Sequence, residues 1–478
     1  MNFKLISKIT GRVLLIDAAC MLLPMLVALI YGESPRPFLM TIGLLLIISL
    51  PLSQMKSKDH FFARDGFFTV GLIWVLISVF GSLPFWFCGH FPSYVDCLFE
   101  SISGFTTTGA SILTAVEGLP RGILFWRSFM HWLGGMGVLV LTVALLPSLG
   151  ARSQFLTKAE ASGPISSKLV PKMSQSSKIL YGIYCALTLI EVVCLLLAGM
   201  PLYDSIVNSF ATGGTGGFSV LNDSIAGYES PAIEVIIAIF MVLFSINFAM
   251  FFLALSGRVR QVLQSDELRF FLGLVVGSTL LIALNINGIY QSASDSLRYA
   301  FFQVSSVIST TGFATADFNQ WPEFSRTLLM FLGACGGCAG STAGGLKCSR
   351  VVLALKGTVR ELSHIIHPRS VKVVKLDGRV VEESTLASVH IYFTVYLLIL
   401  VVVTMVLSLD DFSFGTTVTA AMTTLNNVGP GLEMVGPMGN FSLFSPLSKL
   451  TMSLAMIIGR LEIFPILVLF SRNAWELS

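Results

Sequence analysis

Four short stretches rich in hydroxyl side chains and glycine recur along the chain, and their composition suits contact with a small ion. When each is aligned on one glycine, they recur at intervals of roughly 100 residues, which indicates a four-fold internal repeat. We call them glycine loops 1 to 4. They are F-T-T-T-G-A at 105–110, A-T-G-G-T-G-G-F at 211–218, I-S-T-T-G-F at 308–313 and L-N-N-V-G-P at 425–430. The aligned glycines are Gly109, Gly216, Gly312 and Gly429.

The chemistry that suits these loops is coordination of a dehydrated alkali cation. Such an ion needs carbonyl oxygens in place of its hydration shell, and glycine allows left-handed backbone that points successive carbonyls the same way. Each loop follows a short apolar segment, and a helix there would direct its negative C-terminal end at the ion. Ordinary turns between membrane hairpins would explain any one loop, but four copies favour an ion site. The short segments are 93–104, 202–210, 294–308 and 413–424.

The composition places the chain in a membrane. Hydrophobic residues make up 54% of it and charged residues 12%, with a mean hydropathy of +0.80, whereas soluble proteins carry about 25% charged residues. The net charge of +3 is too small to indicate a nucleic-acid partner. Apolar segments long enough to cross the ~30 Å hydrocarbon layer predict ten spans. They are 13–31, 36–53, 67–88, 122–147, 179–200, 232–256, 269–287, 324–352, 387–409 and 446–470.

These elements predict an all-α fold of repeated units. The first two spans form an N-terminal hairpin without a glycine loop, and the other eight form four units of span, short helix, loop and span. The expected divisions are the hairpin at 1–60, repeats at 61–150, 151–265 and 266–360, and a cytoplasmic linker with the fourth repeat at 361–478.

Charge predicts the orientation of the chain. Most Lys and Arg residues, including those before the first span, lie opposite the glycine loops, which places that side and the N-terminus in the cytoplasm. Basic segments 152–178 and 356–379 could dock a regulator or simply follow this rule. Acidic residues flank the glycine loops and would concentrate cations there, although exposed loops are also commonly polar. These acids are Asp96, Glu100, Glu117, Asp204, Asp223, Glu229, Asp295, Asp317, Glu323, Asp410, Asp411 and Glu433.

A second glycine-rich stretch, which we call the plug loop, runs from Gly333 to Lys347 inside the predicted span 324–352. A nucleotide-binding P-loop is excluded because Leu346 stands where that motif requires lysine. Close helix packing at small-xxx-small spacing is an alternative. Each glycine weakens a helix by up to about 1 kcal/mol, which favours an unwound gate beneath the glycine loops. The expected gate residues are Gly336, Gly337, Gly340, Ser341, Thr342, Gly344 and Gly345.

The last predicted span contains two ionisable residues, Arg460 and Glu462. Such residues usually face the bundle interior and have partners. One interpretation is that Arg460 reaches the membrane surface or pairs with Glu462. The other is that it stands in the pore at the depth of the plug loop, as an electrostatic barrier and part of the gate. Arg127, in the fourth span, is interpreted as an anchor near the outer end.

An enzymatic function is rejected, because the spans hold no paired carboxylates, histidine cluster or nucleophile–base pair. The six histidines are scattered, and the C-x-x-C of Cys335 and Cys338 lacks the second ligand pair of a zinc site.

Together, F-T-T-T-G-A, T-G-G-F-S, S-T-T-G-F, G-G-C-A-G-S-T-A-G-G-L-K and G-R-L-E-I-F-P resemble the TrkH/TrkG and KtrB potassium-uptake family over nearly the whole chain. The N-terminal hairpin resembles the TrkH/TrkG branch. The resemblance implies four membrane-pore-membrane repeats around one pore, in a homodimer of the bacterial inner membrane. It also implies a cytosolic nucleotide-binding regulatory subunit of the TrkA type. Lipid is then the other partner, and no organic cofactor is expected.

The resemblance implies potassium uptake through a selectivity filter, with the plug loop and Arg460 as the gate. Glycine rather than serine at Gly109 resembles the potassium-selective pattern. A sodium-conducting transporter, or one coupled to sodium or protons, is the alternative on the same scaffold. The implied filter residues are Thr107, Thr108, Gly109, Thr215, Gly216, Gly217, Thr310, Thr311, Gly312, Asn427, Val428 and Gly429. Potassium is expected at Thr108, Thr215, Thr311 and Val428.

Overall fold

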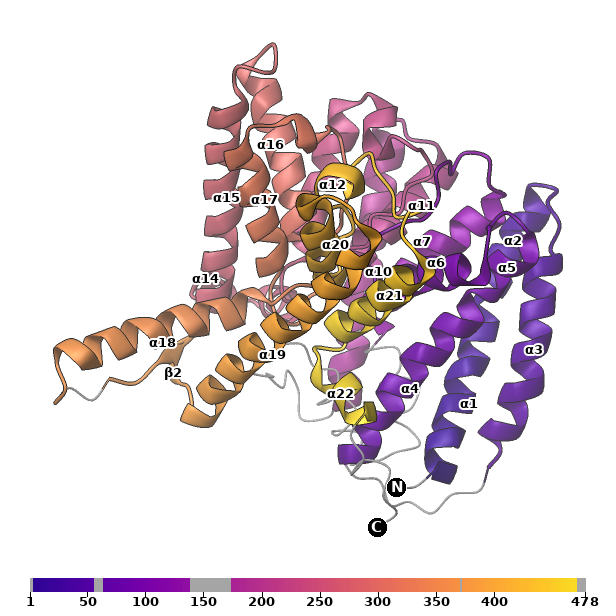
Figure 1. Cartoon of the computed structure of the whole chain (residues 1–478), viewed down its shortest axis with the longest axis horizontal. Coiled ribbons are helices and arrows are strands. Elements are labelled where there is room, and N and C mark those ends of the chain that lie inside the picture. The colour runs from indigo at the N-terminus through magenta and orange to yellow at the C-terminus, as the bar shows by residue number, and fades with distance from the viewer. Residues whose placement is uncertain (1–2, 56–62, 138–172, 370–371, 471–478) are drawn as a thin grey trace.

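A computed structural model describes residues 3–55, 63–137, 173–369 and 372–470, and this part of the chain is predominantly helical (Figure 1). The first-half helices are α1 Phe3–Cys20, α2 Leu22–Ile30, α3 Arg36–Ser53, α4 Ala63–Gly81, α5 Leu83–Cys88, α6 Tyr94–Phe105, α7 Arg121–Gly135, α10 Met173–Leu197, α11 Leu202–Gly214, α12 Pro231–Phe244 and α13 Phe248–Leu255. The second-half helices are α14 Val259–Leu263, α15 Asp266–Ile286, α16 Ala293–Ile308, α17 Glu323–Cys335, α18 Cys348–Ile366, α19 Glu383–Leu407, α20 Phe414–Asn426, α21 Pro446–Arg460 and α22 Phe464–Phe470. Short 3-10 helices are η2 Ser224–Tyr228, η3 Phe318–Gln320, η4 Ser408–Asp410 and η5 Glu433–Val435, and the strands of these ranges are β1 Lys375–Leu376 and β2 Arg379–Val380.

Six helical segments of the described residues are long and apolar enough to cross a membrane, or seven if the bent pair α12 and α13 forms one span. This number indicates a multi-pass membrane protein. The six are Phe3–Ile30, Arg36–Ser53, Asp65–Cys88, Ser177–Leu197, Asp266–Ile286 and Glu383–Asp410.

The other predicted spans are interrupted helices. Helix α17 stops at Cys335, where the plug loop begins, and α18 starts on its far side. Helix α21 stops at Arg460, and α22 begins only at Phe464. Helix α7 ends at Gly135. Residues 138–147 of the predicted span, and the basic segment up to residue 172, lie outside the described residues.

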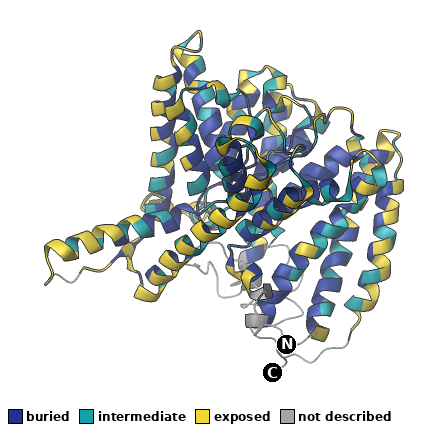
Figure 2. Cartoon of the chain, viewed as in Figure 1, coloured by how far each residue is buried: buried dark blue, intermediate teal, exposed yellow. Residues whose placement is uncertain are grey.

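The N-terminal hairpin forms an extra layer beside the first repeat. Helix α1 packs along α3 and α4, and α2 packs on α7 (Figure 1). The contact between α1 and α3 is close, because a Cβ added to Gly11 would lie 2.6 Å from the Ser53 backbone nitrogen. The outward side of α3 is exposed and apolar, as Ile47 and Met40 show (Figure 2). Such a surface is compatible with lipid.

Four short helices, α6, α11, α16 and α20, carry the glycine loops at their C-terminal ends. Serine N-caps fix the starts of α6, α16 and α20: the Ser93 hydroxyl accepts the Asp96 N–H at 3.2 Å, the Ser292 hydroxyl accepts the Asp295 N–H at 3.1 Å, and the Ser413 hydroxyl accepts the Thr416 N–H at 3.3 Å. Serine at the cap and an acid in the first turn both favour a helix start.

Helix α18 and the adjoining part of α19 extend away from the helical bundle as an arm (Figure 1). The two-stranded hairpin β1–β2 lies along this arm, and a small apolar cluster holds the elements together. The buried members of this cluster are Val352, Leu353, Val374, Leu376, Val381, Leu386 and Val389.

Candidate functional site

The four short helices end in the same Schellman-type turn. After α6, the Thr107 N–H donates to the Gly104 carbonyl at 3.1 Å, and the Thr108 N–H donates to Ser103 at 2.9 Å. The same pair of bonds, reaching three and five residues back, recurs in all four loops. The residues in the left-handed position are Thr107, Thr215, Thr310 and Asn427, with φ of 56°, 57°, 58° and 55°. Four different sequences therefore fold into one backbone geometry.

Glycine loop 2 has a different register from the sequence alignment. The left-handed Thr215 is followed two positions later by Gly217, as Thr107 is by Gly109. The alignment on Gly216 is therefore wrong by one residue. A-T-G-G-T-G-G-F contains several glycines, and only the backbone conformation distinguishes them. The equivalent glycines are Gly109, Gly217, Gly312 and Gly429, with φ of 77°, 78°, 85° and 91°.

Each equivalent glycine lies against a carbonyl oxygen of the next loop, and the four contacts close a ring. The distances from an added Cβ to that oxygen are 1.9 Å for Gly109 to Gly216, 2.0 Å for Gly217 to Thr311, 2.4 Å for Gly312 to Val428 and 2.7 Å for Gly429 to Thr108. A side chain at these positions would collide with backbone. In glycine loop 2, the carbonyl of the ring belongs to Gly216. Potassium is expected from the sequence at Thr215, and the one-residue shift in register moves this expected contact to Gly216.

The ring can interact with a cation in two ways. Four carbonyl oxygens at the contacts between loops can replace water around a dehydrated ion. The C-terminal ends of α6, α11, α16 and α20, which carry partial negative charge, all lead into it.

The fourth loop, which has Asn-Asn-Val in place of hydroxyl residues, joins the ring through an amide. The Asn427 side chain donates from Nδ2 to the Thr108 hydroxyl at 2.9 Å and to the Met456 carbonyl at 2.9 Å. Within loop 1, the hydroxyls of Thr106 and Thr108 are 2.8 Å apart. Asn427 therefore bridges the last loop to the first and to α21.

Two of the acids expected in an exposed vestibule are buried in ion pairs instead. Glu100 accepts a bond from Arg127 at 2.6 Å, and Asp96 accepts one from Lys449 at 2.6 Å. The Arg127 guanidinium also lies 4.0 Å from the centre of the Phe218 ring, at the end of loop 2. Arg127 is thus an internal support behind loops 1 and 2 rather than an outer anchor. The spacing of Glu100 and Arg127, on separate helices, gave no sign of this pairing.

Glu433, in η5 after glycine loop 4, is exposed and binds the start of α20. Its carboxylate accepts bonds from the Ser413 hydroxyl and from the Thr416 N–H at 3.0 Å and hydroxyl at 3.1 Å. These hydrogen bonds, that of Ser413 foremost, hold the pKa of Glu433 below its usual range. Its negative charge therefore persists at neutral and mildly acidic pH.

His131, which lies with Arg127 in the fourth predicted span, is a buried support. Its Nδ1 is 2.8 Å from the Gly104 carbonyl, and its ring lies 4.2 Å from that of Phe218. A Cβ added to Gly216 would lie 2.3 Å from the imidazole. The ring thus fills the space behind loops 1 and 2.

Replacing His131 with alanine is expected to lower both stability and ion selectivity. Loss of a buried ring of this size costs about 2–5 kcal/mol, and loop 2 then gains room to relax at Gly216. We expect a lower unfolding temperature and a severalfold loss of potassium preference in ion-competition flux assays. His90→Ala, at an exposed position, is the control. Wild-type selectivity in a destabilised His131→Ala protein would limit His131 to a folding role.

The plug loop lies directly against glycine loops 3 and 4. It is non-helical from Gly336 to Lys347. The Gly344 N–H donates to the Thr310 hydroxyl at 2.6 Å, and the Gly345 N–H donates to the Asn426 carbonyl at 2.9 Å. The alternative of a continuous, closely packed helix is therefore wrong, because residues 336–347 are not helical and some of their backbone groups bond to glycine loops 3 and 4.

A break in the predicted span 232–256 anchors the other side of the plug loop. Helices α12 and α13 meet at 92°, so the predicted span is a bent pair of helices and not one continuous helix. Backbone groups left free at the bend bind the loop: Cys338 donates to Ser245 at 2.9 Å, and Phe248 donates to Gly340 at 3.1 Å. Ser245 begins a run, Ser-Ile-Asn, whose interruption of the apolar segment was the available sign of a break.

Arg460 joins the plug loop to α7. Its guanidinium donates to the carbonyls of Thr342 at 2.7 Å, Gly134 at 2.7 Å and Gly135 at 3.1 Å. Glu462 instead binds the guanidinium of Arg350. The interpretation of an Arg460–Glu462 pair is therefore wrong, because the turn after α21 points Glu462 toward α18.

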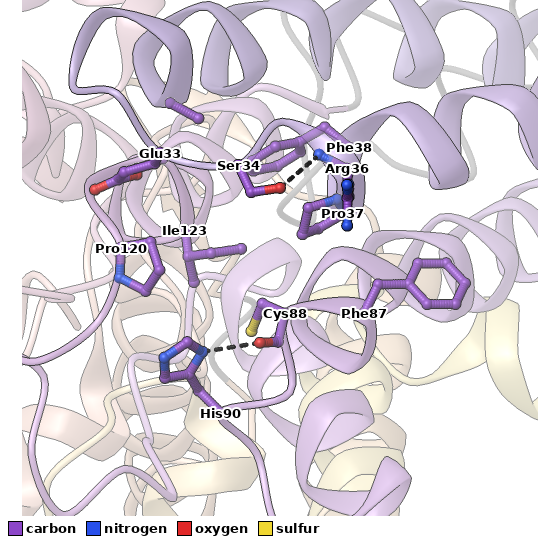
Figure 3. A pocket seen from close by; sticks show the side chains of 12 residues that line it. Glu33, Ser34, Arg36, Pro37, Phe38, Phe87, Cys88, His90, Pro120 and Ile123 are labelled. Atoms are coloured by element: carbon purple, nitrogen blue, oxygen red, sulfur yellow. Dashed lines mark hydrogen bonds between the residues drawn. The ribbon is translucent and has the colours of Figure 1, made fainter.

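A separate pocket of about 240 Å³ lies between the N-terminal hairpin and the first repeat (Figure 3). It contains Glu33, Cys88 and His90, and His90 Nδ1 is 3.0 Å from the Cys88 carbonyl. The Glu33 carboxylate accepts the backbone N–H groups of Arg121 at 2.6 Å and Gly122 at 2.9 Å, so it caps α7. Among the described residues, no group of three His, Cys, Asp or Glu side chains could hold a metal. Glu33 thus has a structural explanation.

The apolar helices, the ring of four loops and the non-helical plug loop packed against it are together features of a multi-pass membrane transport protein. A model of the TrkH family of cation transport proteins matches residues 36–476. The chain belongs to this family. The prediction that it is a transporter and not an enzyme is confirmed by this membership.

Similar proteins cover the entire chain. The Trk system potassium uptake protein TrkH of Salmonella typhimurium is 40% identical, with 100% of both chains covered. The Trk system potassium uptake protein TrkG of Escherichia coli K12 is 33% identical over 99% of both. The crystal structure of the potassium transporter TrkH from Vibrio parahaemolyticus matches with a TM-score of 0.89, 34% identity and 100% coverage of both chains.

Proposed function

We propose that the chain carries potassium ions through the ring of glycine-loop carbonyls. The closed ring is the observation that supports this function most directly, because its oxygens suit a dehydrated cation. The relatives named as potassium uptake proteins support potassium as that cation. Potassium is then the cargo, and one charge moving through 100 mV supplies about 2.3 kcal/mol.

The plug loop and Arg460 form the gate of this pathway. The loop bonds to glycine loops 3 and 4 through Gly344 and Gly345, so it blocks the passage on one side of the ring. Arg460 fixes the loop and adds positive charge there. Opening requires the loop to move away from Thr310 and Asn426.

The proposed topology has ten spans and a cytoplasmic N-terminus in the bacterial inner membrane. Six of these spans are the long apolar segments given above. The other four contain α7, the pair α12–α13, the pair α17–α18 and the pair α21–α22. The hairpin at 1–60 precedes repeats at 61–150, 151–265, 266–360 and 361–478. The basic arm around α18 then faces the cytosol, where a nucleotide-binding regulatory subunit of the TrkA type can dock.

The test of this function is rubidium-86 uptake into proteoliposomes that contain the purified chain, with excess potassium or sodium as competitor. Potassium transport predicts that potassium blocks uptake and sodium does not. Equal competition by sodium would contradict potassium selectivity and support a sodium-conducting transporter. Because the proposed gate is closed without a regulator, the assay also uses the Arg460→Ala variant discussed below.

We further propose that two copies associate through α18. One side of this helix packs on the small cluster of the arm, whereas the other is apolar and exposed. Exposed apolar patches of this kind mark interaction surfaces, and the resemblance to a dimeric family identifies a second copy as the partner. The exposed residues are Leu355, Val359, Leu362, Ile365 and Ile366.

Introducing negative charge among the exposed apolar residues of α18 is expected to dissociate the dimer. Val359→Glu together with Leu362→Glu should convert the detergent-solubilised protein from dimer to monomer in mass photometry, because buried unpaired carboxylates oppose association. His364→Glu, on the opposite side of α18, is the matched control and should leave the dimer intact. A dimer that survives the double change would exclude this interface.

A further inference from the structure

Glu267, the second residue of α15, binds the plug loop at two points. Its Oε1 accepts the Ala339 N–H at 2.7 Å and the Ser349 N–H at 3.0 Å. Ala339 lies within the plug loop, and Ser349 lies in the first turn of α18. The carboxylate is only 7% exposed. One side chain therefore connects the middle of the loop to the helix that follows it.

These bonds are well placed to hold the loop. Hydrogen bonds to a buried carboxylate are stronger than those between neutral groups, and a negative charge is favourable at the N-terminus of α18. The glycine-rich backbone provides little stiffness of its own. The position of the loop thus depends on its external attachments, of which Glu267 supplies two.

The start of α15, which carries Glu267, is itself fixed to the cytoplasmic hairpin. The Asp266 N–H donates to Asp377 Oδ1 at 2.7 Å, and the Asp377 N–H donates to Asp266 Oδ2 at 3.1 Å. Lys356 of α18 also donates to Asp266 Oδ2 at 2.7 Å. The start of α15, and with it Glu267, is therefore held by the same arm that the regulator is proposed to contact.

A cavity of about 780 Å³ lies beside this attachment. It is lined by Glu267, Ala339 and Ser349, by Asn247 at the α12–α13 bend, and by the hairpin residues Asp377 and Arg379. The loop consequently has space on this side, away from Thr310 and Asn426. Movement into that space requires the bonds to Glu267 to break.

We propose that Glu267 is a positioning residue that clasps the plug loop in its closed arrangement, and that opening moves the loop into the adjoining cavity. This inference rests on the proposed function of the plug loop as the gate. It adds two details: the hydrogen bonds of Glu267 to Ala339 and Ser349 must break, and the loop then moves into the cavity.

The experiment measures rubidium-86 flux and the labelling of Cys338 in proteoliposomes without a regulator. Cys338 precedes Ala339 and is 1% exposed, so its rate of modification by N-ethylmaleimide reports loop movement once the other seven of the eight cysteines are replaced by serine. Glu267→Ala should raise flux and labelling about tenfold or more. Glu267→Gln retains an acceptor without charge and should give an intermediate increase. Potassium preference over sodium should remain at the wild-type level in both.

The controls distinguish an error in the proposed role of Glu267 from an error in the proposed gate. Glu383→Ala removes a carboxylate that is 74% exposed and lies outside the acids that flank the glycine loops, and it should change neither readout. If Arg460→Ala raises flux and labelling but the Glu267 variants do not, the clasp is wrong while the gate stands. If neither raises them, the gate itself is wrong, and the clasp with it. Should Glu267→Ala fail to fold, Glu267→Gln decides by the same readouts.

Discussion

Gly312→Ser is expected to lower the preference for potassium over sodium by at least about tenfold, which corresponds to ~1.4 kcal/mol in relative ion stabilisation. Gly312 has φ of 85°, which strains any other residue. An added Cβ would lie 2.4 Å from the Val428 carbonyl oxygen and 2.7 Å from Pro430 Cδ. The serine must therefore displace the carbonyl of the next loop, and the ring loses its geometry. Competition by sodium for rubidium-86 uptake measures the change.

The control for this substitution is Gly118→Ser, where an added Cβ meets nothing within 4 Å and the backbone is not left-handed. It should retain wild-type selectivity. Gly217→Ser should behave like Gly312→Ser, since its Cβ would lie 2.0 Å from the Thr311 oxygen. Unchanged selectivity in folded Gly312→Ser protein would show that the ring is not the selective element.

Arg460→Ala is expected to raise basal potassium flux by roughly ten- to a hundredfold. The substitution removes three hydrogen bonds, to Thr342, Gly134 and Gly135. Bonds from a charged donor contribute about 1.5–3 kcal/mol each, so their loss frees the plug loop from α7. It also removes a positive charge that repels cations. Initial rates of rubidium-86 uptake into proteoliposomes measure the increase.

Arg460→Lys distinguishes the two effects of this residue. Lysine keeps the charge but cannot form the same forked set of bonds. A flux near that of Arg460→Ala would identify the attachment as the larger effect, whereas a flux near wild type would identify the charge. Arg326→Ala removes an arginine whose partner Glu323 is exposed, and it should leave flux unchanged. A closed pore in folded Arg460→Ala protein would contradict the proposed gate.

The sequence alone was sufficient to predict features that depend on neighbouring residues, such as membrane segments, helix interruptions and the glycine loops. Apolar length identified membrane segments such as Arg36–Ser53 and Asp266–Ile286, because the hydrocarbon thickness sets how many residues a span needs. The run of glycines from Gly333 to Gly345 predicted an interrupted helix, because glycine is the weakest helix former after proline. Repetition of hydroxyl residues with glycine located the four loops.

Tertiary contacts decided the rest. The register of loop 2 depends on which glycine can approach the Thr311 carbonyl, and the four glycines in the stretch 211–218 made the local pattern ambiguous. The pairing of Glu100 with Arg127, and the clasp of Glu267 on Ala339, join residues distant in sequence. The bend between α12 and α13 is stabilised by bonds from the plug loop, almost a hundred residues away. By itself, the sequence determined the apolar segments and the places of the four glycine loops, because local propensity and apolar length set them. Only the tertiary structure determined which atoms meet, because that depends on packing between repeats.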